Sequence, residues 1–124
     1  MPCTVLVVED DDIVRDSTET LLSSAGFDVL VASNGDEALS LLEETEVQVL
    51  LTDVVMPGMS GTELAVQVRV RFPAIKIAFM TGSNSGAAEA APLGPLMIKP
   101  IRAGEMIDEV TRLLTARPIS ECYI

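Results

Sequence analysis

The chain has 124 residues, the usual size of one domain with its own hydrophobic core. Its 8 basic and 19 acidic residues give a formal net charge of −11, which makes nucleic acid a poor partner. The sequence contains no histidine, which excludes histidine acid–base catalysis, a histidine-ligated zinc site and a phosphohistidine within it.

No apolar run is long enough to cross a bilayer, and the N-terminal residues lack the basic-then-apolar pattern of a secretion signal. We therefore expect a cytoplasmic protein that does not contact membranes. The two cysteines, Cys3 and Cys122, lie near opposite ends of the sequence and could be neighbours in an alternating strand–helix fold. Because the cytoplasm is reducing, we expect both to be free thiols.

Apolar runs alternate with helix-like patterns along the chain, which favours βαβ units around a parallel sheet. The hydrophobic share of 48% fits a sheet that is buried on both faces. The expected strands are residues 4–9, 27–32, 47–53, 75–81 and 96–99.

The first predicted helix runs from about residue 12 to 25, with Asp11 or Asp12 as its N-cap and Gly26 as its stop signal. Its expected buried stripe is Val14, Thr18, Leu21, Leu22 and Ala25. The second helix, residues 35–44, is expected to bury Ala38, Leu41 and Leu42.

The third helix is ambiguous, because residues 66–72 alternate in polarity like a strand. Ser60 and Glu63 form a capping-box signature, and two successive parallel strands need a crossover, so a helix is favoured. Its core-facing residues would be Leu64, Ala65, Val68 and Phe72. Val66 and Val70 would then point outward.

Residues 84–95 leave room for only a weak or shortened fourth helix, because Pro92 breaks the pattern. The last helix is expected at about residues 103–116, burying Ile107, Val110 and Leu114. We expect one domain over residues 1–117, a short tail over 118–124, and no output domain.

Polar side chains follow the carboxyl ends of the predicted strands. Glu9 and Asp10 follow the first strand, Asp53 ends the third, Thr81 ends the fourth, and Lys99 follows the fifth. Because the carboxyl ends of parallel strands meet at one edge of a sheet, we expect these residues to form one site. Carboxylates gathered there would repel each other without a hard cation, and their oxygen atoms suit Mg²⁺.

Such a set suits phosphoryl transfer, which needs a nucleophile, a metal and fixed donors. Asp53 is the candidate nucleophile and would form an aspartyl phosphate. Asp10 and Asp53 could bind Mg²⁺ directly, and Glu9 could act through a bound water. Lys99 could pair with Asp53 and then with a phosphate oxygen, and Thr81 offers a hydroxyl donor. Each residue alone has a plainer explanation as a cap, a turn or a solvated charge, and only their joint placement at the strand ends indicates a site.

These motifs together resemble the receiver domains of two-component response regulators, the CheY-like superfamily. The matching segments are Glu9-Asp10, Asp53 with the Met-Pro-Gly-Met-Ser-Gly run at 56–61, Thr81-Gly82 and Lys99-Pro100. The resemblance implies an α/β fold of the doubly wound, flavodoxin-like type, with five parallel strands in the order 2-1-3-4-5.

The resemblance also implies that Asp53 is phosphorylated with Mg²⁺ by the phosphohistidine of a histidine kinase or a histidine phosphotransfer protein. The chain would then be a phosphoacceptor with self-catalysed phosphotransfer and slow autodephosphorylation, not an enzyme for other substrates. The main-chain carbonyl of Val55 would complete the metal site, and the Lys99-Pro100 peptide would be cis. The partner would dock on an apolar patch made of Ile13, Val14, Pro100 and Ile101, although a place in the core is favoured for Val14 itself.

Three departures from the family pattern affect what the resemblance implies. Leu96 stands where many members have an aromatic switch residue, so the usual ring rotation is not available. The stretch between Thr81 and Lys99 is about one helical turn short, which affects the surface through which many members signal. Val55 offers no polar group that could guide water to a phosphate.

The leading hypothesis is a stand-alone receiver that signals by protein–protein contact to an unknown target. A C-terminal receiver fragment of a hybrid histidine kinase stays open as an alternative. A phosphatase of the haloacid-dehalogenase type also uses Asp, Thr, Lys and Mg²⁺, but it needs a second Asp at the position of Val55. A phosphate-independent binding module is disfavoured by the complete acid, Thr and Lys set, and no Gly-rich nucleotide-binding loop is present.

Overall fold

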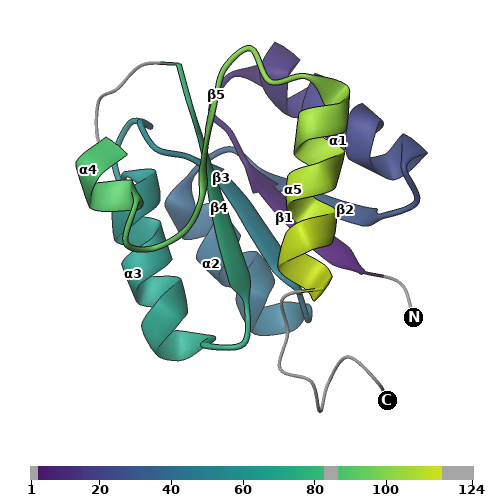
Figure 1. Ribbon diagram of the computed structural model, residues 1–124. Coiled ribbons are helices and arrows are strands. Elements are labelled where there is room, and N and C mark those ends of the chain that lie inside the picture. Colours follow the sequence, from purple (N-terminus) through teal and green to yellow (C-terminus); the bar gives the residue numbers. More distant parts are fainter. Residues whose placement is uncertain (1–2, 83–86, 116–124) are drawn as a thin grey trace.

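The apolar runs of the chain form a five-stranded parallel sheet in the order β2-β1-β3-β4-β5 (Figure 1). The computed structural model describes residues 3–82 and 87–115. The strands are β1 (Thr4–Val8), β2 (Asp28–Ala32), β3 (Val49–Asp53), β4 (Lys76–Thr81) and β5 (Leu96–Ile98). The predicted α/β fold class and strand order are confirmed, and each strand lies within two residues of its predicted bounds.

Helices cover both faces of this sheet. They are α1 (Asp12–Ser24), α2 (Gly35–Glu44), α3 (Gly61–Arg71), α4 (Ala87–Ala90) and α5 (Ala103–Thr115). Figure 1 shows α1 and α5 on one face and α2 and α3 on the other. The arrangement follows from parallel pairing, because every crossover helix must pack against one face of the sheet.

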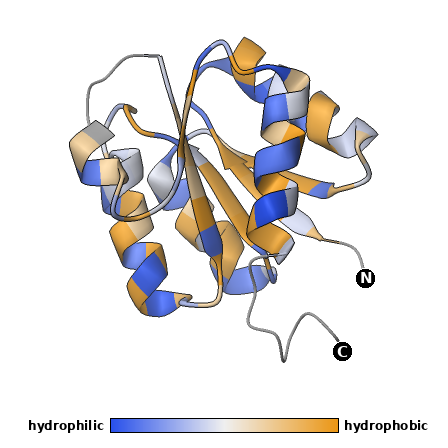
Figure 2. Cartoon of the chain, viewed as in Figure 1, coloured by the Kyte–Doolittle hydropathy of each residue, from blue (hydrophilic) through white to orange (hydrophobic). Residues whose placement is uncertain are grey.

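The core consists of two apolar clusters, one on each side of the sheet, because successive strand residues point to opposite faces. Leu6, Leu50 and Phe79 belong to the cluster beneath α2 and α3. Val7 and Leu51 belong to the cluster beneath α1 and α5. Figure 2 shows the resulting hydrophobic strands between helices that are hydrophobic on one side only. The buried central strands therefore fix the positions of the side chains at their carboxyl ends.

The helix termini follow the local sequence signals. Asp11 is the N-cap of α1, and its carboxylate accepts hydrogen bonds from the amides of Ile13 and Val14 at 2.9 and 3.1 Å. Gly26 follows the helix at a φ of 100°, a conformation that favours glycine. The predicted capping box of Ser60 and Glu63 is present at the start of α3. Sequence alone thus places these helix boundaries well.

The predicted buried stripes are partly wrong. Ala25 is exposed because it lies beyond α1 as its C-cap, and Val14 is only half-buried and belongs to neither core cluster. In α2 the buried stripe is Gly35, Ala38, Leu39 and Leu42, which are spaced at three- and four-residue steps. Leu39 therefore takes the place expected for Leu41, which is half-buried. In α5 the fully buried residues are Met106 and Val110, while Ile107 and Leu114 are half-buried.

The other helix predictions are confirmed on the described residues, except that Leu21 and Phe72 are half-buried and Phe72 is the C-cap of α3. α3 buries Leu64, Ala65 and Val68 and exposes Val66 and Val70, as expected. Within the described residues α4 has four residues, Ala87–Ala90, and ends before Pro92, in agreement with the short fourth helix. Cys3 has a free thiol. The first residues of the predicted fourth helix, the tail and Cys122 lie outside the described residues.

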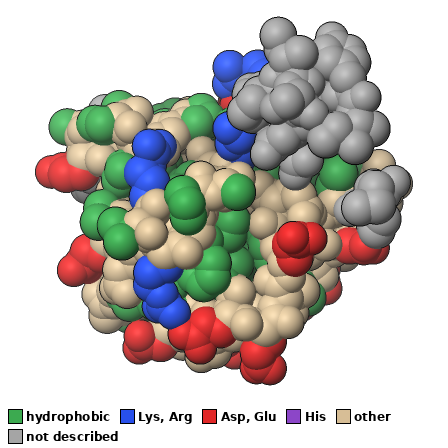
Figure 3. Space-filling view, turned by 90° about the horizontal axis from the view of Figure 1, so that it is seen from below, with side chains coloured by type: hydrophobic (Ala, Val, Ile, Leu, Met, Phe, Trp, Pro, Cys, Tyr) green, Lys and Arg blue, Asp and Glu red, His purple; other side chains and the backbone are tan. Residues whose placement is uncertain are grey.

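Figure 3 shows the end of the molecule that is opposite to the carboxyl ends of the strands. In the part of this face that the structure describes, Lys and Arg side chains lie among hydrophobic and acidic side chains. Arg71 pairs with Glu43, and Arg69 donates to the carbonyl of Leu93 at 2.9 Å. None of the helices formed by residues 3–82 and 87–115 combines the length and apolarity that a bilayer crossing requires.

Candidate functional site

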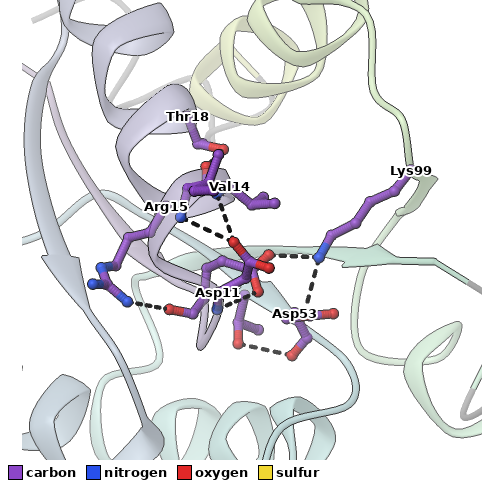
Figure 4. A network of polar contacts seen from close by, with 9 residues as sticks. Asp11, Val14, Arg15, Thr18, Asp53 and Lys99 are labelled. Atoms are coloured by element: carbon purple, nitrogen blue, oxygen red, sulfur yellow. Dashed lines mark hydrogen bonds and ion pairs between the residues drawn. The ribbon is translucent and has the colours of Figure 1, made fainter.

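Strand register brings the predicted polar residues to one edge of the sheet. Val8 is paired with Thr52, so Glu9 and Asp10 leave β1 beside Asp53. Asp53 is paired with Met80, which puts Thr81 one residue further along the neighbouring strand. The amide of Lys99 donates to the carbonyl of Thr81 at 2.7 Å, so Lys99 completes the group. Figure 4 shows Asp53 and Lys99 pointing toward each other across this edge.

Three carboxylates form the centre of the site. Glu9, Asp10 and Asp53 each offer an oxygen atom, and these three atoms lie within 4.8 Å of one another. Glu9 is 1% exposed and Asp53 is 6% exposed, whereas Asp10 is an exposed residue. A set of oxygen donors with one open side fits Mg²⁺, which binds through a few carboxylates and keeps several water ligands. Their separation is therefore compatible with one shared cation.

Lys99 is the positive charge within this cluster. Its Nζ lies 3.0 Å from Asp53 Oδ2 and 2.5 Å from Glu9 Oε1 (Figure 4). The pairing with Asp53 was expected from the sequence, but the pairing with Glu9 was not. The sequence feature that could have indicated the pairing with Glu9 is the position of Glu9 at the end of a central strand, because a carboxylate buried there requires a partner for its charge. Lys99 thus holds two buried carboxylates together.

Glu9 is held at several of its polar groups. Its Oε2 accepts a hydrogen bond from the amide of Asp11 at 3.2 Å, while Oε1 accepts from Lys99. Its amide donates to the carbonyl of Ala32 at 3.1 Å, and its own carbonyl accepts from Arg15 at 3.0 Å. Both carboxylate oxygens therefore have protein donors, so Glu9 orients Lys99 whether or not it also contacts a metal-bound water.

The electrostatics of the cluster shift two pKa values. Partial burial, together with the hydrogen bond and negative charge of Glu9, raises the pKa of Asp10 above its usual value. Burial lowers the pKa of Lys99, but its hydrogen bonds to Glu9 and Asp53 outweigh burial and leave the pKa raised. Without a cation, the site thus keeps Lys99 charged and opposes ionisation of Asp10.

We predict that Asp10→Asn stabilises the metal-free protein at neutral pH. A raised folded-state pKa means that Asp10 adds stability below its unfolded value of 3.8 and loses it as pH rises through the folded value. At pH 7 the ionised side chain therefore costs stability, by less than about 1 kcal/mol because it is exposed. Thermal unfolding at pH 7 and pH 3 should show a higher Tm for the variant only at pH 7. A lower Tm at pH 7, with the exposed helix residue Asp108→Asn as control, would contradict this assignment.

The backbone near Asp53 is closely packed. Gly61 starts α3, and a Cβ atom on it would lie 1.9 Å from the carbonyl oxygen of Asp53. Only glycine therefore permits the start of α3 to approach the end of β3. The Lys99-Pro100 peptide is cis, as expected. The side chain of Val55, next but one after Asp53, is 56% exposed and lies open to solvent.

A groove of about 440 Å³ lies beside the site, between α1 and the segment that enters α5. All four residues of the predicted apolar patch line it: Ile13, Val14, Pro100 and Ile101. Lys99 lines it as well, so the groove adjoins the charged cluster. The expectation that Val14 belongs to the core is wrong, because this side chain forms part of the groove wall.

The comparison with family models gives a match over residues 5–111 to the response regulator receiver domain. The chain belongs to this family. It is 34% identical to the response regulator receiver protein CpdR of Brucella abortus, covering 90% of this chain and 97% of that protein. It is 44% identical to the sensor kinase CckA of the same organism over 81 residues, or 64% of this chain.

A solved structure of the response regulator TrrA from Thermotoga maritima, described as a complex with Mg²⁺ and BeF, has a TM-score of 0.83 to this chain. The two are 26% identical, and the match covers 90% of this chain and 98% of TrrA. Several other curated relatives are longer proteins, and the chain spans 9% to 50% of their length. Membership of the receiver family decides against the haloacid-dehalogenase-type phosphatase. Receiver domains bind Mg²⁺ at an acidic pocket, and Glu9, Asp10 and Asp53 form an acidic cluster in this chain.

Proposed function

We propose that this receiver domain accepts a phosphoryl group on Asp53 from the phosphohistidine of a histidine kinase or phosphotransfer protein. The observation that carries the proposal is the convergence of the carboxylates of Glu9, Asp10 and the buried Asp53, which have oxygen atoms within 4.8 Å of one another. The Nζ of Lys99 lies 3.0 Å from Asp53 Oδ2. Neither the acidic composition of the chain nor the α/β fold by itself requires a lysine and three acidic residues at this edge of the sheet. The family membership supports a histidine kinase or phosphotransfer protein as the class of donor.

In this proposal the chain's own residues position the reaction. A carboxylate oxygen of Asp53 attacks the phosphorus atom, the P–N bond to the donor imidazole breaks, and the imidazole leaves as its neutral form after taking up a proton. Asp10, Asp53 and the carbonyl of Val55 would hold Mg²⁺, which supplies charge neutralisation to the phosphoryl oxygens when bound. Lys99 would exchange its contact with Asp53 for a phosphoryl oxygen while Glu9 keeps it in place. Thr81, buried at the end of β4, would donate its hydroxyl to the same group.

The groove beside α1 is the proposed docking surface for the donor. It combines apolar walls with direct access to the charged cluster, and Ile13 on its rim is 78% exposed. A helix that carries a phosphohistidine could place apolar residues on this patch and its phosphoryl group next to Asp53. Autodephosphorylation by water would follow at the same site, with Val55 offering no polar group to assist it.

The response to phosphorylation should differ from that of receivers with an aromatic switch residue. Leu96 is half-buried and packs against the cluster beneath α2 and α3. A leucine in this place cannot report the movement of Thr81 by a ring rotation. We therefore propose that the signal is read by protein–protein contact near the site itself, in a stand-alone receiver.

The similarity to CpdR, which this chain matches over 97% of its length, supports a regulator that consists of a receiver alone. The 44% identity to part of the sensor kinase CckA supports the alternative, a receiver that forms part of a hybrid kinase. Both alternatives share the same chemistry at Asp53 and differ in where the donor histidine is located.

The proposal is tested by incubating the purified chain with acetyl phosphate and Mg²⁺ and measuring the intact mass. We expect the addition of one phosphoryl group per chain, and no addition when EDTA removes the metal. Repeated turnover of a phosphoester substrate would instead indicate a phosphatase. No mass change in the presence of Mg²⁺ would contradict the proposal.

A further inference from the structure

The side chain of Arg15 on α1 contacts the loop that carries the acidic residues, Glu9 to Asp11, in addition to the N-cap contacts of Asp11. Arg15 projects from the first turn of α1 back toward the end of β1 (Figure 4). Its Nη1 donates to the carbonyl oxygen of Glu9 at 3.0 Å, and its Nη2 pairs with Asp12. The side chain of Arg15 is 17% exposed, and its contact with the carbonyl of Glu9 is partly buried.

The contact fixes the peptide between Glu9 and Asp10. The amide of Glu9 is already bound to the carbonyl of Ala32, and its carboxylate to Lys99 and the amide of Asp11. The carbonyl of Glu9 is the remaining polar group of this residue, and Arg15 holds it. The direction of this carbonyl sets the plane of the following peptide and hence the position of the Asp10 side chain.

We propose that Arg15 is a positioning residue for the metal site, which it serves by orienting the Glu9–Asp10 peptide so that the Asp10 carboxylate faces Asp53. This inference rests on the proposed Mg²⁺ site. Arg15 contributes no ligand, and its positive charge opposes the binding of a cation. Arg15 therefore contributes to the site by orienting a ligand, as do other groups that hydrogen-bond to metal ligands without contacting the metal.

The two effects of Arg15 have opposite signs, which makes the inference testable. Loss of the charge alone would tighten Mg²⁺ binding, because it removes repulsion near three carboxylates. Loss of the hydrogen bond to Glu9 would weaken binding, because Asp10 would no longer be held opposite Asp53. If Arg15 only stabilised the fold, its removal would lower Tm and leave Mg²⁺ affinity unchanged or higher.

The test is a titration of the full chain with Mg²⁺, followed by ¹H–¹⁵N NMR because the chain has no tryptophan. We expect Arg15→Met, which keeps the aliphatic stem, to weaken Mg²⁺ binding about tenfold. Arg15→Lys should recover part of the affinity, since its ammonium can donate to the same carbonyl. The control is Arg112→Met, which removes an equivalent charge and an i,i+3 ion pair with Glu109 on α5, and should leave the affinity within about twofold of the wild type.

The outcomes separate this inference from the proposed function. A wild-type chain that binds no Mg²⁺ would contradict the proposed function and, with it, the role of Arg15. Wild-type binding that is equally tight or tighter in Arg15→Met would overturn only the role of Arg15. If Arg15→Met does not fold, the milder Arg15→Gln takes its place, with weaker binding expected and equal or tighter binding contradicting the inference.

Discussion

Asp53→Asn is expected to abolish phosphorylation and to leave the fold intact. The amide has no nucleophilic oxygen of comparable strength and no negative charge for a cation, so both requirements of the reaction are lost. The structure should tolerate the change, because Asn keeps an oxygen that can accept from Lys99, and Lys99 keeps its 2.5 Å contact with Glu9. Intact-mass measurement with acetyl phosphate and Mg²⁺ should show one phosphoryl group on the wild type and none on the variant.

Two comparisons make this result specific to Asp53. Asp108→Asn, which changes an exposed carboxylate on α5, should be phosphorylated like the wild type. The Tm of Asp53→Asn should be equal to or above that of the wild type, since one of three clustered carboxylates has been neutralised. Phosphorylation of Asp53→Asn at the wild-type level would mean that another residue is the acceptor.

Lys99→Met is expected to destabilise the metal-free protein at neutral pH. The variant leaves the carboxylates of Glu9 and Asp53, which are 1% and 6% exposed, without their cation. Removing one partner from a fully buried ion pair costs about 3–5 kcal/mol. Lys99 itself is 23% exposed, so we expect a loss of about 2 kcal/mol in the free energy of unfolding, measured by urea denaturation.

The conditions of the experiment distinguish the charge of Lys99 from its packing. Mg²⁺ should restore part of the stability of Lys99→Met, because it replaces the missing positive charge between the carboxylates.

The pKa of Lys99 is raised, so its stabilising effect is complete below the unfolded value of 10.5 and is lost only as pH rises through the higher folded value. The difference between wild type and variant should therefore be constant from neutral pH to about pH 10 and shrink above it. Lys76→Met, which changes the other lysine, should cost less than about 0.5 kcal/mol, and an equal loss in both variants would contradict this account.

The fold was predictable because most local signals agreed with the strand–helix alternation. Apolar runs without alternation indicated buried parallel strands, and the capping box of Ser60 and Glu63 identified α3 despite its strand-like polarity. The site residues followed from topology, since parallel strands deliver their carboxyl ends to one edge. Strand register then placed Asp53 and Lys99 within contact distance, as expected.

What the sequence could not give was the choice among partners that depend on side-chain geometry. The pairing of Lys99 with Glu9 and the contact of Arg15 with the carbonyl of Glu9 depend on rotamers and on the path of one loop. The burial of Leu39 in place of Leu41 depends on the rotation of α2 about its axis, which the apolar pattern leaves open. Val14 was assigned to the core because a helical stripe does not show where a groove interrupts the packing.

The most direct test of the proposed function is to locate the phosphoryl group. Treatment of the phosphorylated chain with borohydride converts an aspartyl phosphate into homoserine, and peptide mass spectrometry then identifies the modified position. We predict homoserine at position 53 and at no other aspartate, and only in samples that contained Mg²⁺. Homoserine elsewhere, or an unmodified Asp53 in a fully phosphorylated sample, would contradict it.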